Sequence, residues 1–267
     1  MNEFDNRIDQ KFQELQACGK KALIAFLTAG DPDYNTTEQT VLEMQRQGAD
    51  LIELGVPFSD PIAEGPVIQA ASQRALDAGT TLAGIFDLVR RLRSKTDIPL
   101  LLMMYVNMIF RFGKDTFFSL CRECGVDGVI VPDLPYEERE EILHQAQACG
   151  VRLINLVTPT SAERIQAIAS NSKGFLYCVS STGVTGVRSE FTTDFDSFFA
   201  AVREHASAPC AVGFGISTPG QVRQMKRYCD GVIVGSAIVR ILAEHGRQAV
   251  PYVGEFVHSL REALDQP

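Results

Sequence analysis

The sequence predicts an α/β protein with the (β/α)8 TIM-barrel fold, and two observations carry this prediction. Eight short apolar segments alternate with eight longer segments of helical periodicity. The chain has 267 residues, close to the roughly 250 residues that such a barrel needs. Alternating strand and helix patterns are typical of a parallel sheet that helices cover. A doubly wound open sheet is the alternative that the same alternation allows.

The expected strands are nearly continuous apolar runs and do not alternate between apolar and polar residues. This pattern is typical of parallel strands that are buried on both faces. The expected strands cover residues 23–28, 50–54, 100–105, 128–131, 153–157, 175–179, 210–214 and 231–234.

Two helices are expected in addition to the eight repeats. Apolar residues recur at helical spacing near the N-terminus and predict a helix that covers one end of the core. A short helical run over 237–242 directly follows the eighth strand. Capping patterns support other helix starts: a capping box at 160–163, a proline at the first helical position in Thr218-Pro219, and acidic residues at 135–141. The N-terminal apolar residues are Phe4, Ile8, Phe12 and Leu15.

Composition limits the classes of function. No linker or change of composition divides the chain, so residues 1–267 are expected to form a single domain. The net charge of −8 argues against nucleic acid or an anionic membrane as a partner. The polar N-terminus does not resemble a signal peptide, and the longest apolar run (98–109) is too short to span a bilayer. Seven scattered cysteines, an odd number, favour reduced thiols in a cytoplasmic protein.

Two glutamates flank a stretch that glycine and proline keep irregular. Glu53 lies at the end of the second expected strand, and Glu64 lies in the loop that follows, just before a helical run over 67–78. In this fold the chemistry occurs at the C-terminal ends of strands and in the loops after them. Acids in such different surroundings can have separated pKa values, as general acid–base catalysis requires. The structural alternative is a strand-end acid and an acid favoured by a helix dipole.

Glycines after the seventh and eighth strands predict a phosphate site. Gly213-Phe-Gly215 follows one strand, and Gly235-Ser236 follows the next and opens the short helix. Glycine allows close approach of the backbone, and a helix N-terminus presents free N–H groups to an anion. Residues 180–189, with two glycines and several hydroxyl groups, suggest a lid. Ordinary tight turns and an ordinary surface loop are the alternatives.

Other residues narrow the chemistry. Asn107 and Asp133 follow the third and fourth strands and either serve the site or hold loops together. No lysine ends an expected strand and the four histidines are far apart, so neither a Schiff-base nor a zinc mechanism is favoured. Cys121 and Cys124 are expected to be half-buried helical thiols, and no metal site is assigned. Acid–base chemistry on a small phosphorylated substrate, without a cofactor, is the remaining hypothesis.

The combination of these segments resembles the tryptophan synthase alpha chain family. Residues 52–65 resemble the family signature. The similarity continues in order through residues 104–107, 132–135, 183–186, 213–217 and 235–237, and therefore covers nearly the whole chain.

The resemblance implies a lyase of tryptophan biosynthesis that reversibly cleaves indole-3-glycerol phosphate to indole and glyceraldehyde 3-phosphate. Glu53 would protonate indole C3 and accept a proton from the glycerol hydroxyl next to the breaking bond. Glu64 would stabilise the charge that develops at the indole N–H. The resemblance also implies substrate-binding residues: Gly186, Gly215, Gly235 and Ser236 at the phosphate, Phe26, Tyr105, Tyr177 and Phe214 around the indole, and Thr185 in the lid.

The resemblance further implies an α2β2 complex. Indole would pass to a beta subunit that carries pyridoxal phosphate, while this chain would need no cofactor. The loop from Pro57 to Pro61, including Asp60, would face the partner, since rigid proline-rich loops suit an interface. Alternatively, these prolines only shape the active site.

Two departures from the family pattern bear on the site. The second acid is most familiar as aspartate, whereas Glu64 is one methylene longer, and a displacement of about 1 Å can cost around a hundredfold in rate. The lid begins Ser180-Ser181-Thr182 where other members often carry arginine, although Arg188 lies further along. Two other functions remain open: a sugar-phosphate isomerase with the same phosphate site, and an inactive subunit that only activates a beta partner.

Overall fold

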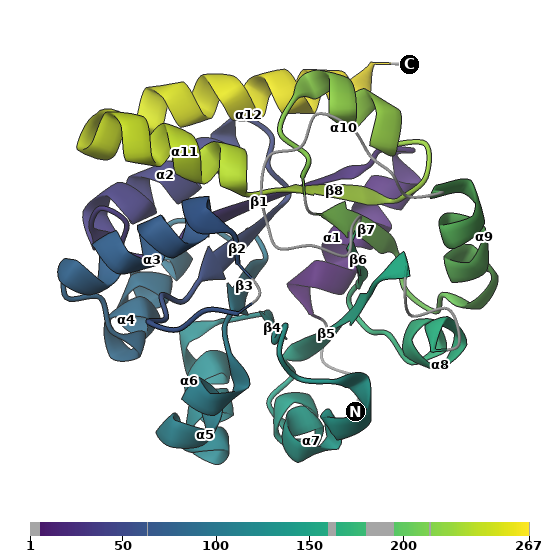
Figure 1. Ribbon diagram of the computed structural model, residues 1–267, viewed down its shortest axis with the longest axis horizontal. Coiled ribbons are helices and arrows are strands. Elements are labelled where there is room, and N and C mark those ends of the chain that lie inside the picture. The colour runs from purple at the N-terminus through teal and green to yellow at the C-terminus, as the bar shows by residue number, and fades with distance from the viewer. Residues whose placement is uncertain (1–5, 63, 160–163, 180–194, 214, 267) are drawn as a thin grey trace.

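The eight strands form a closed parallel barrel in chain order, β1 to β8 (Figure 1). The computed structural model describes residues 6–62, 64–159, 164–179, 195–213 and 215–266. Register pairs between β1 and β8, such as Ala22 with Gly231, close the barrel and exclude the open sheet. The TIM-barrel prediction is confirmed. The strands are β1 (Ala22–Thr28), β2 (Leu51–Gly55), β3 (Leu100–Met103), β4 (Gly128–Ile130), β5 (Arg152–Val157), β6 (Leu176–Val179), β7 (Cys210–Gly213) and β8 (Gly231–Val234).

Helices surround the barrel, and α11 is the short helix expected after the eighth strand (Figure 1). It begins at Ser236 and runs to His245, three residues past the expected end. The helices are α1 (Arg7–Ala17), α2 (Tyr34–Arg46), α3 (Pro66–Asp77), α4 (Leu82–Arg93), α5 (Val106–Phe112), α6 (Lys114–Cys124), α7 (Glu140–Ala148), α8 (Ile165–Ser170), α9 (Phe195–His205), α10 (Pro219–Met225), α11 (Ser236–His245) and α12 (Val250–Asp265), with short 3-10 turns η1 (Tyr136–Glu138) and η3 (Gly246–Gln248).

Helix α1 closes the N-terminal end of the barrel, as the sequence predicts. Its buried residues Ile8, Phe12 and Leu15 join the inward-facing side chains of the strands in one hydrophobic cluster. In Figure 1 the helix lies at the far end of the barrel. Phe4, also expected on this face, lies outside the described residues. With one end filled by α1, a ligand of the barrel is expected at the other end.

The predicted helix starts are confirmed where the structure describes them. The Thr218 hydroxyl accepts a hydrogen bond from the Gln221 amide at 3.2 Å, and Pro219 is the first residue of α10. Glu140 and Glu141 lie in the first turn of α7. The capping box at 160–163 lies outside the described residues.

Aspartates that precede even-numbered strands secure the bottom of three strand pairs. The backbone N–H of each aspartate donates to the carbonyl of a residue near the start of the previous strand. The aspartate carboxylate in turn accepts a hydrogen bond from the backbone amide of that same residue. This two-way link fixes the register where the barrel begins. The pairs, with carboxylate distances, are Asp50 with Leu23 (2.8 Å), Asp127 with Leu100 (2.8 Å) and Asp230 with Cys210 (2.9 Å).

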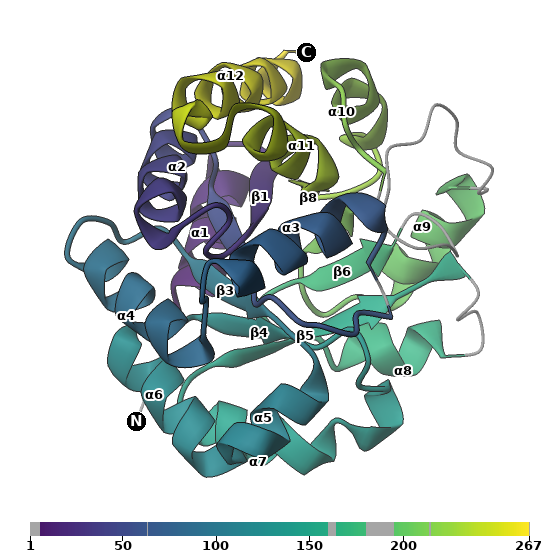
Figure 2. The same cartoon turned by 60° about the vertical axis from the view of Figure 1, so that its left-hand side comes forward.

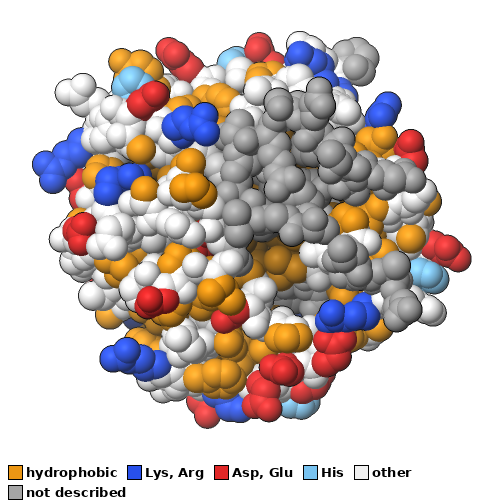
Figure 3. Space-filling view, viewed as in Figure 1, with side chains coloured by type: hydrophobic (Ala, Val, Ile, Leu, Met, Phe, Trp, Pro, Cys, Tyr) orange, Lys and Arg blue, Asp and Glu red, His pale blue; other side chains and the backbone are white. Residues whose placement is uncertain are grey.

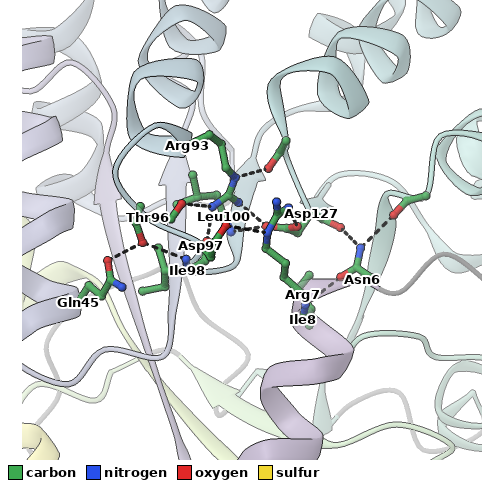
Figure 4. A network of polar contacts seen from close by, with 12 residues as sticks. Asn6, Arg7, Ile8, Gln45, Arg93, Thr96, Asp97, Ile98, Leu100 and Asp127 are labelled. Carbon is green, nitrogen blue, oxygen red and sulfur yellow. Dashed lines mark hydrogen bonds and ion pairs between the residues drawn. The ribbon is translucent and has the colours of Figure 1, made fainter.

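Asp127 is the most connected of the three (Figure 4). Its side chain is only 4% exposed, and it accepts from Arg7 at 2.9 Å and from Arg93. The Asn6 side chain donates to the Asp127 carbonyl at 2.8 Å and also caps α1. This network therefore attaches α1 and the end of α4 to the bottom of the barrel.

We expect Asp127→Ala to lower the free energy of unfolding by about 3 kcal/mol, because it leaves the Arg93 guanidinium, whose side chain is only 11% exposed, without its carboxylate. Chemical or thermal unfolding measures the loss. Asp230→Ala is the matched control. The Asp230 side chain is 53% exposed and its carboxylate lies 3.3 Å from the Lys21 amine, so its ion pair is weak and a loss of about 1 kcal/mol is expected. Equal losses in the two variants would contradict the argument.

Two further observations concern composition. Cys121 and Cys124 are both buried in α6, so the expectation of half-buried thiols was wrong. Helix α6 packs against α4 and α7, and this packing buries both thiols. Among the described residues, no helix combines the length and apolarity that crossing a membrane requires.

Candidate active site

Glu53 lies inside the barrel and is the second residue of β2 whose side chain points inward. Side chains along a strand alternate, and Leu51 belongs to the interior cluster, so Glu53 points inward too. Its neighbours in the register are Phe26 on β1 and Leu101 on β3. The side chain is 1% exposed, and neither carboxylate oxygen has a hydrogen-bond partner among the described residues. Burial raises the pKa of Glu53 from 4.5 to about 8, so the acid holds its proton at neutral pH.

Tyr177 lies next to Glu53 from the opposite part of the barrel. It is one of the inward-facing residues of β6, and burial together with the nearby Glu53 carboxylate raises the pKa of its phenol well above 10.0. A Cβ built on Gly213 of β7 would lie 2.5 Å from the Tyr177 hydroxyl oxygen. Gly213 therefore makes room for Tyr177, where the sequence suggested only a tight turn or a ligand contact.

Phe26 connects the Glu53 strand with the predicted phosphate loop. A Cβ on Gly55 would lie 2.6 Å from the Phe26 ring, and a Cβ on Gly235 would lie 3.0 Å from it. Phe26 also packs with Val239 of α11 in a small cluster above the main interior. Helices α3 and α11 lie side by side over this part of the barrel (Figure 2). Phe26 is thus a neighbour of both Glu53 and Gly235.

Glu64 lies in the loop between β2 and α3 and points toward the residues after β3. The Tyr105 hydroxyl hydrogen-bonds to its carboxylate and also accepts a hydrogen bond from the Ile62 amide at 3.0 Å. The Tyr105 ring packs against Phe58, with ring centroids 5.0 Å apart. Burial is the main cause of a raised pKa for Glu64. Its Oε2 is buried and has no hydrogen-bond partner among the described residues.

Asp133 is a neighbour of Glu64 that the sequence did not identify as such. Its charge adds to the raised pKa of Glu64, and its Oδ1 accepts the Val106 amide at 2.9 Å, at the first residue of α5. Asp133 therefore holds a loop in place, and it also lies close enough to a candidate acid to affect its pKa. The position of Asp133 shortly after β4, next to Pro132, was the feature of the sequence that could have indicated its place near the site.

The predicted phosphate residues lie at the same end of the barrel. Gly215 has φ +84°, a conformation that favours glycine, and Gly235 caps α11 without a side-chain hydrogen bond. Ser236 is the first residue of α11, so its amide is among those at the positive end of the helix dipole. Thr185, Gly186 and Phe214, like the whole predicted lid, lie outside the described residues.

The predicted partner-facing loop is exposed only over its second half. Pro57 is buried, Pro61 is half-buried and Asp60 is exposed, while Ile62 is 74% exposed. Figure 3 shows this face of the molecule: charged side chains lie mostly toward the rim, and hydrophobic ones reach the surface nearer the middle. Among the described residues, no group of three His, Cys, Asp or Glu side chains is arranged to hold a metal ion.

The model of the family "Tryptophan synthase alpha chain" matches residues 12–265. The chain belongs to this family. The resemblance predicted from the sequence is thus confirmed.

Individual relatives agree over the whole length. A tryptophan synthase alpha chain from Caldanaerobacter subterraneus subsp. tengcongensis is 52% identical over 97% of this chain and 100% of its own length. The crystal structure of tryptophan synthase subunit alpha from Legionella pneumophila has a TM-score of 0.88 at 36% identity, covering 97% of this chain and 98% of that chain. A structure of the tryptophan synthase α2β2 complex from Pyrococcus furiosus has a TM-score of 0.84 at 38% identity, covering 90% and 98%.

Proposed function

We propose that this chain is the alpha subunit of tryptophan synthase and cleaves indole-3-glycerol phosphate to indole and glyceraldehyde 3-phosphate, with Glu53 and Glu64 as its catalytic acids. Membership of the tryptophan synthase alpha chain family supports the reaction. The observation that carries the residue assignment is a buried inward carboxyl group, Glu53, whose pKa is raised to about 8. Such a group is a proton donor at neutral pH.

The first step is proton transfer from Glu53 to C3 of the indole ring. The ring becomes an indolenine, and positive charge develops at its nitrogen. The ionised form of Glu64 stabilises this charge by accepting the N–H hydrogen bond. Protonated indole can take up the electron pair of the breaking bond, so the step needs neither a Schiff base nor a Lewis acid.

The second step returns the proton. Glu53, now ionised, accepts the proton of the glycerol hydroxyl adjacent to the ring. The C–C bond breaks, its electron pair restores the aromatic indole, and the hydroxyl carbon becomes the aldehyde of glyceraldehyde 3-phosphate. Glu53 ends protonated, as it began. Its lack of a hydrogen-bond partner among the described residues supports this role, because no protein group there competes with the substrate for either oxygen.

The other assigned residues bind the substrate. The backbone at Gly215 and the N-terminus of α11 at Gly235 and Ser236 receive the phosphate. Phe26, Tyr105 and Tyr177 surround the indole ring, with Tyr177 also next to Glu53. Thr185, Gly186 and Phe214 complete this set on family resemblance alone.

The chain functions together with a beta subunit, to which pyridoxal phosphate belongs. The related Pyrococcus furiosus structure is that of an α2β2 complex. We assign the partner-facing side to the loop with Pro57, Asp60 and Pro61, and its exposed Ile62 supports this assignment. The alpha reaction itself is proposed to use no cofactor, and the setting of the complex is proposed to be the cytoplasm.

Release of indole from indole-3-glycerol phosphate tests the proposed function. The purified chain should release indole, and more quickly when a beta subunit is added. Isomerisation of a sugar phosphate without any indole would favour the isomerase alternative. Stimulation of a beta subunit without indole release by this chain would favour the inactive activator.

We also expect a bell-shaped dependence of kcat/KM on pH, with an alkaline limb near pH 8. The reaction begins with protonated Glu53, whose pKa is about 8, so activity falls as pH rises through that value. The acid limb reports Glu64, which must be ionised to accept the N–H. Steady-state kinetics across pH measure both limbs, and activity that rises continuously to pH 10 would contradict the assignment.

A further inference from the structure

We propose that the Tyr105 hydroxyl is a positioning group that holds Glu64 by one oxygen, Oε1, and leaves Oε2 as the acceptor for the substrate's indole N–H. The inference rests on the proposed function and goes beyond it, because it gives Tyr105 a task other than lining the indole pocket. It also explains how a glutamate serves at this position.

The direction of the hydrogen bonds follows from the donors and acceptors. A tyrosine hydroxyl has one proton to donate. The Ile62 amide donates to the Tyr105 oxygen at 3.0 Å, so the phenol proton is available to the Glu64 carboxylate with which Tyr105 is hydrogen-bonded. Since Oε2 of Glu64 has no hydrogen-bond partner among the described residues, this bond reaches Oε1. One oxygen is therefore held, and the other is buried with its capacity to accept unused.

Tyr105 is itself firmly placed. It is 3% exposed, and its ring lies 5.0 Å from that of Phe58, centroid to centroid. The next residue, Val106, is fixed from the neighbouring loop because its amide donates to Asp133 at 2.9 Å. The loop after β2 is therefore bonded to Tyr105, and the loop after β4 to the next residue, Val106. The extra methylene gives the Glu64 side chain additional conformational freedom. The hydrogen bond with Tyr105 removes part of this freedom, so the longer side chain can reach one defined position.

Two side chains act on the Glu64 carboxylate in opposite directions. The Tyr105 hydroxyl donates to the ionised form and stabilises it, whereas the Asp133 carboxylate repels it. Among the described residues these are the polar or charged side chains known to act on it, since the Gln69 amide of α3 donates only to the Glu64 backbone carbonyl, at 2.8 Å. Removing each group should therefore shift the titration of Glu64 in an opposite sense.

The test compares Tyr105→Phe with Asp133→Asn in the full-length chain, using indole-3-glycerol phosphate. Tyr105→Phe keeps the ring contact with Phe58 but removes both hydroxyl bonds. We expect kcat to fall about tenfold with KM within about twofold, and the acid limb of the pH profile to move to higher pH. Asp133→Asn keeps an oxygen for the Val106 amide, and it should move the acid limb to lower pH.

Tyr34→Phe is the matched control. The Tyr34 hydroxyl also accepts an amide, that of Thr81 at 2.9 Å, and donates to the Thr81 carbonyl at 3.2 Å, but it lies on α2, away from Glu64. This variant should leave kcat and the pH profile unchanged. A double variant supplies a second readout: once Glu64→Gln has removed the acid, adding Tyr105→Phe should change kcat less than twofold.

The outcomes separate this inference from the proposed function. A wild-type chain that releases no indole overturns the function. An active wild type overturns the inference if Tyr105→Phe lowers only thermal stability, if its acid limb does not move, or if Asp133→Asn moves the limb in the same direction. Opposite shifts, with a cost that disappears in the Glu64→Gln background, support the inference.

Discussion

Replacing Glu53 by glutamine should reduce indole release by about 10³-fold, because this one side chain is proposed both to donate the proton to C3 and to accept the hydroxyl proton. The amide has nearly the shape of the protonated acid that the buried site holds at neutral pH. The fold and the phosphate loops should therefore be unaffected. We expect kcat to fall, while the affinity for glycerol phosphate, measured by calorimetry, stays within about twofold.

A matched substitution separates this effect from the general loss of a buried carboxylate. Glu38 on α2 is 8% exposed and pairs with Arg91 at 2.9 Å on the outside of the barrel. Glu38→Gln should keep turnover within about twofold, although it removes that ion pair. Unchanged turnover in Glu53→Gln, or an equal loss in both variants, would refute the role of Glu53.

Most of the fold could be predicted from the sequence, because burial on both faces leaves a clear apolar signature in each strand. The expected strands agree with the structure to within two residues. The largest difference is β3, expected to reach Tyr105 but ending at Met103. Apolar character continues through Tyr105 because that side chain is buried, while the backbone has already turned to begin α5 at Val106.

The candidate site could be predicted in part. The strand-end position of Glu53 marks it as a candidate acid, and alternation along β2 explains why it points inward. In contrast, the relation of Asp133 to Glu64 depends on loops that meet only in the closed barrel, and no spacing in the chain encodes it. The two-way link between Asp127 and Leu100 was missed for the same reason, since Asp127 precedes β4 and Leu100 begins β3, 27 residues earlier in the chain.

The glycines at the ends of β7 and β8 have a structural role that the sequence did not indicate. Their position after β7 and β8 indicated close approach to a ligand, and the structure adds a second demand on the same residues. Gly213 makes room for the Tyr177 side chain, because a Cβ there would lie 2.5 Å from the hydroxyl oxygen, and Gly235 makes room for the Phe26 ring, which a Cβ would contact at 3.0 Å. A sequence pattern records that a side chain is excluded at such a position, and the fold decides which neighbour excludes it.

The same burial that keeps Glu53 protonated at neutral pH should make the protein less stable as pH rises. Between pH 4.5 and about 8 the native state keeps a proton on Glu53 that the unfolded chain has released. The native state then binds more protons, so the free energy of unfolding falls with increasing pH in this window. For a pKa raised from 4.5 to about 8 the loss approaches roughly 5 kcal/mol.

Glu53→Gln removes this titration, so the inactive variant should be the more stable protein at neutral and alkaline pH. The difference in free energy of unfolding between variant and wild type should be near zero at pH 4, grow from about pH 4.5 to pH 8, and then remain constant. Urea unfolding at a series of pH values measures it, with Glu38→Gln as the variant that should show no such increase. A difference independent of pH would mean that Glu53 is ionised in the native barrel, and the proton it is proposed to give to C3 would have no source.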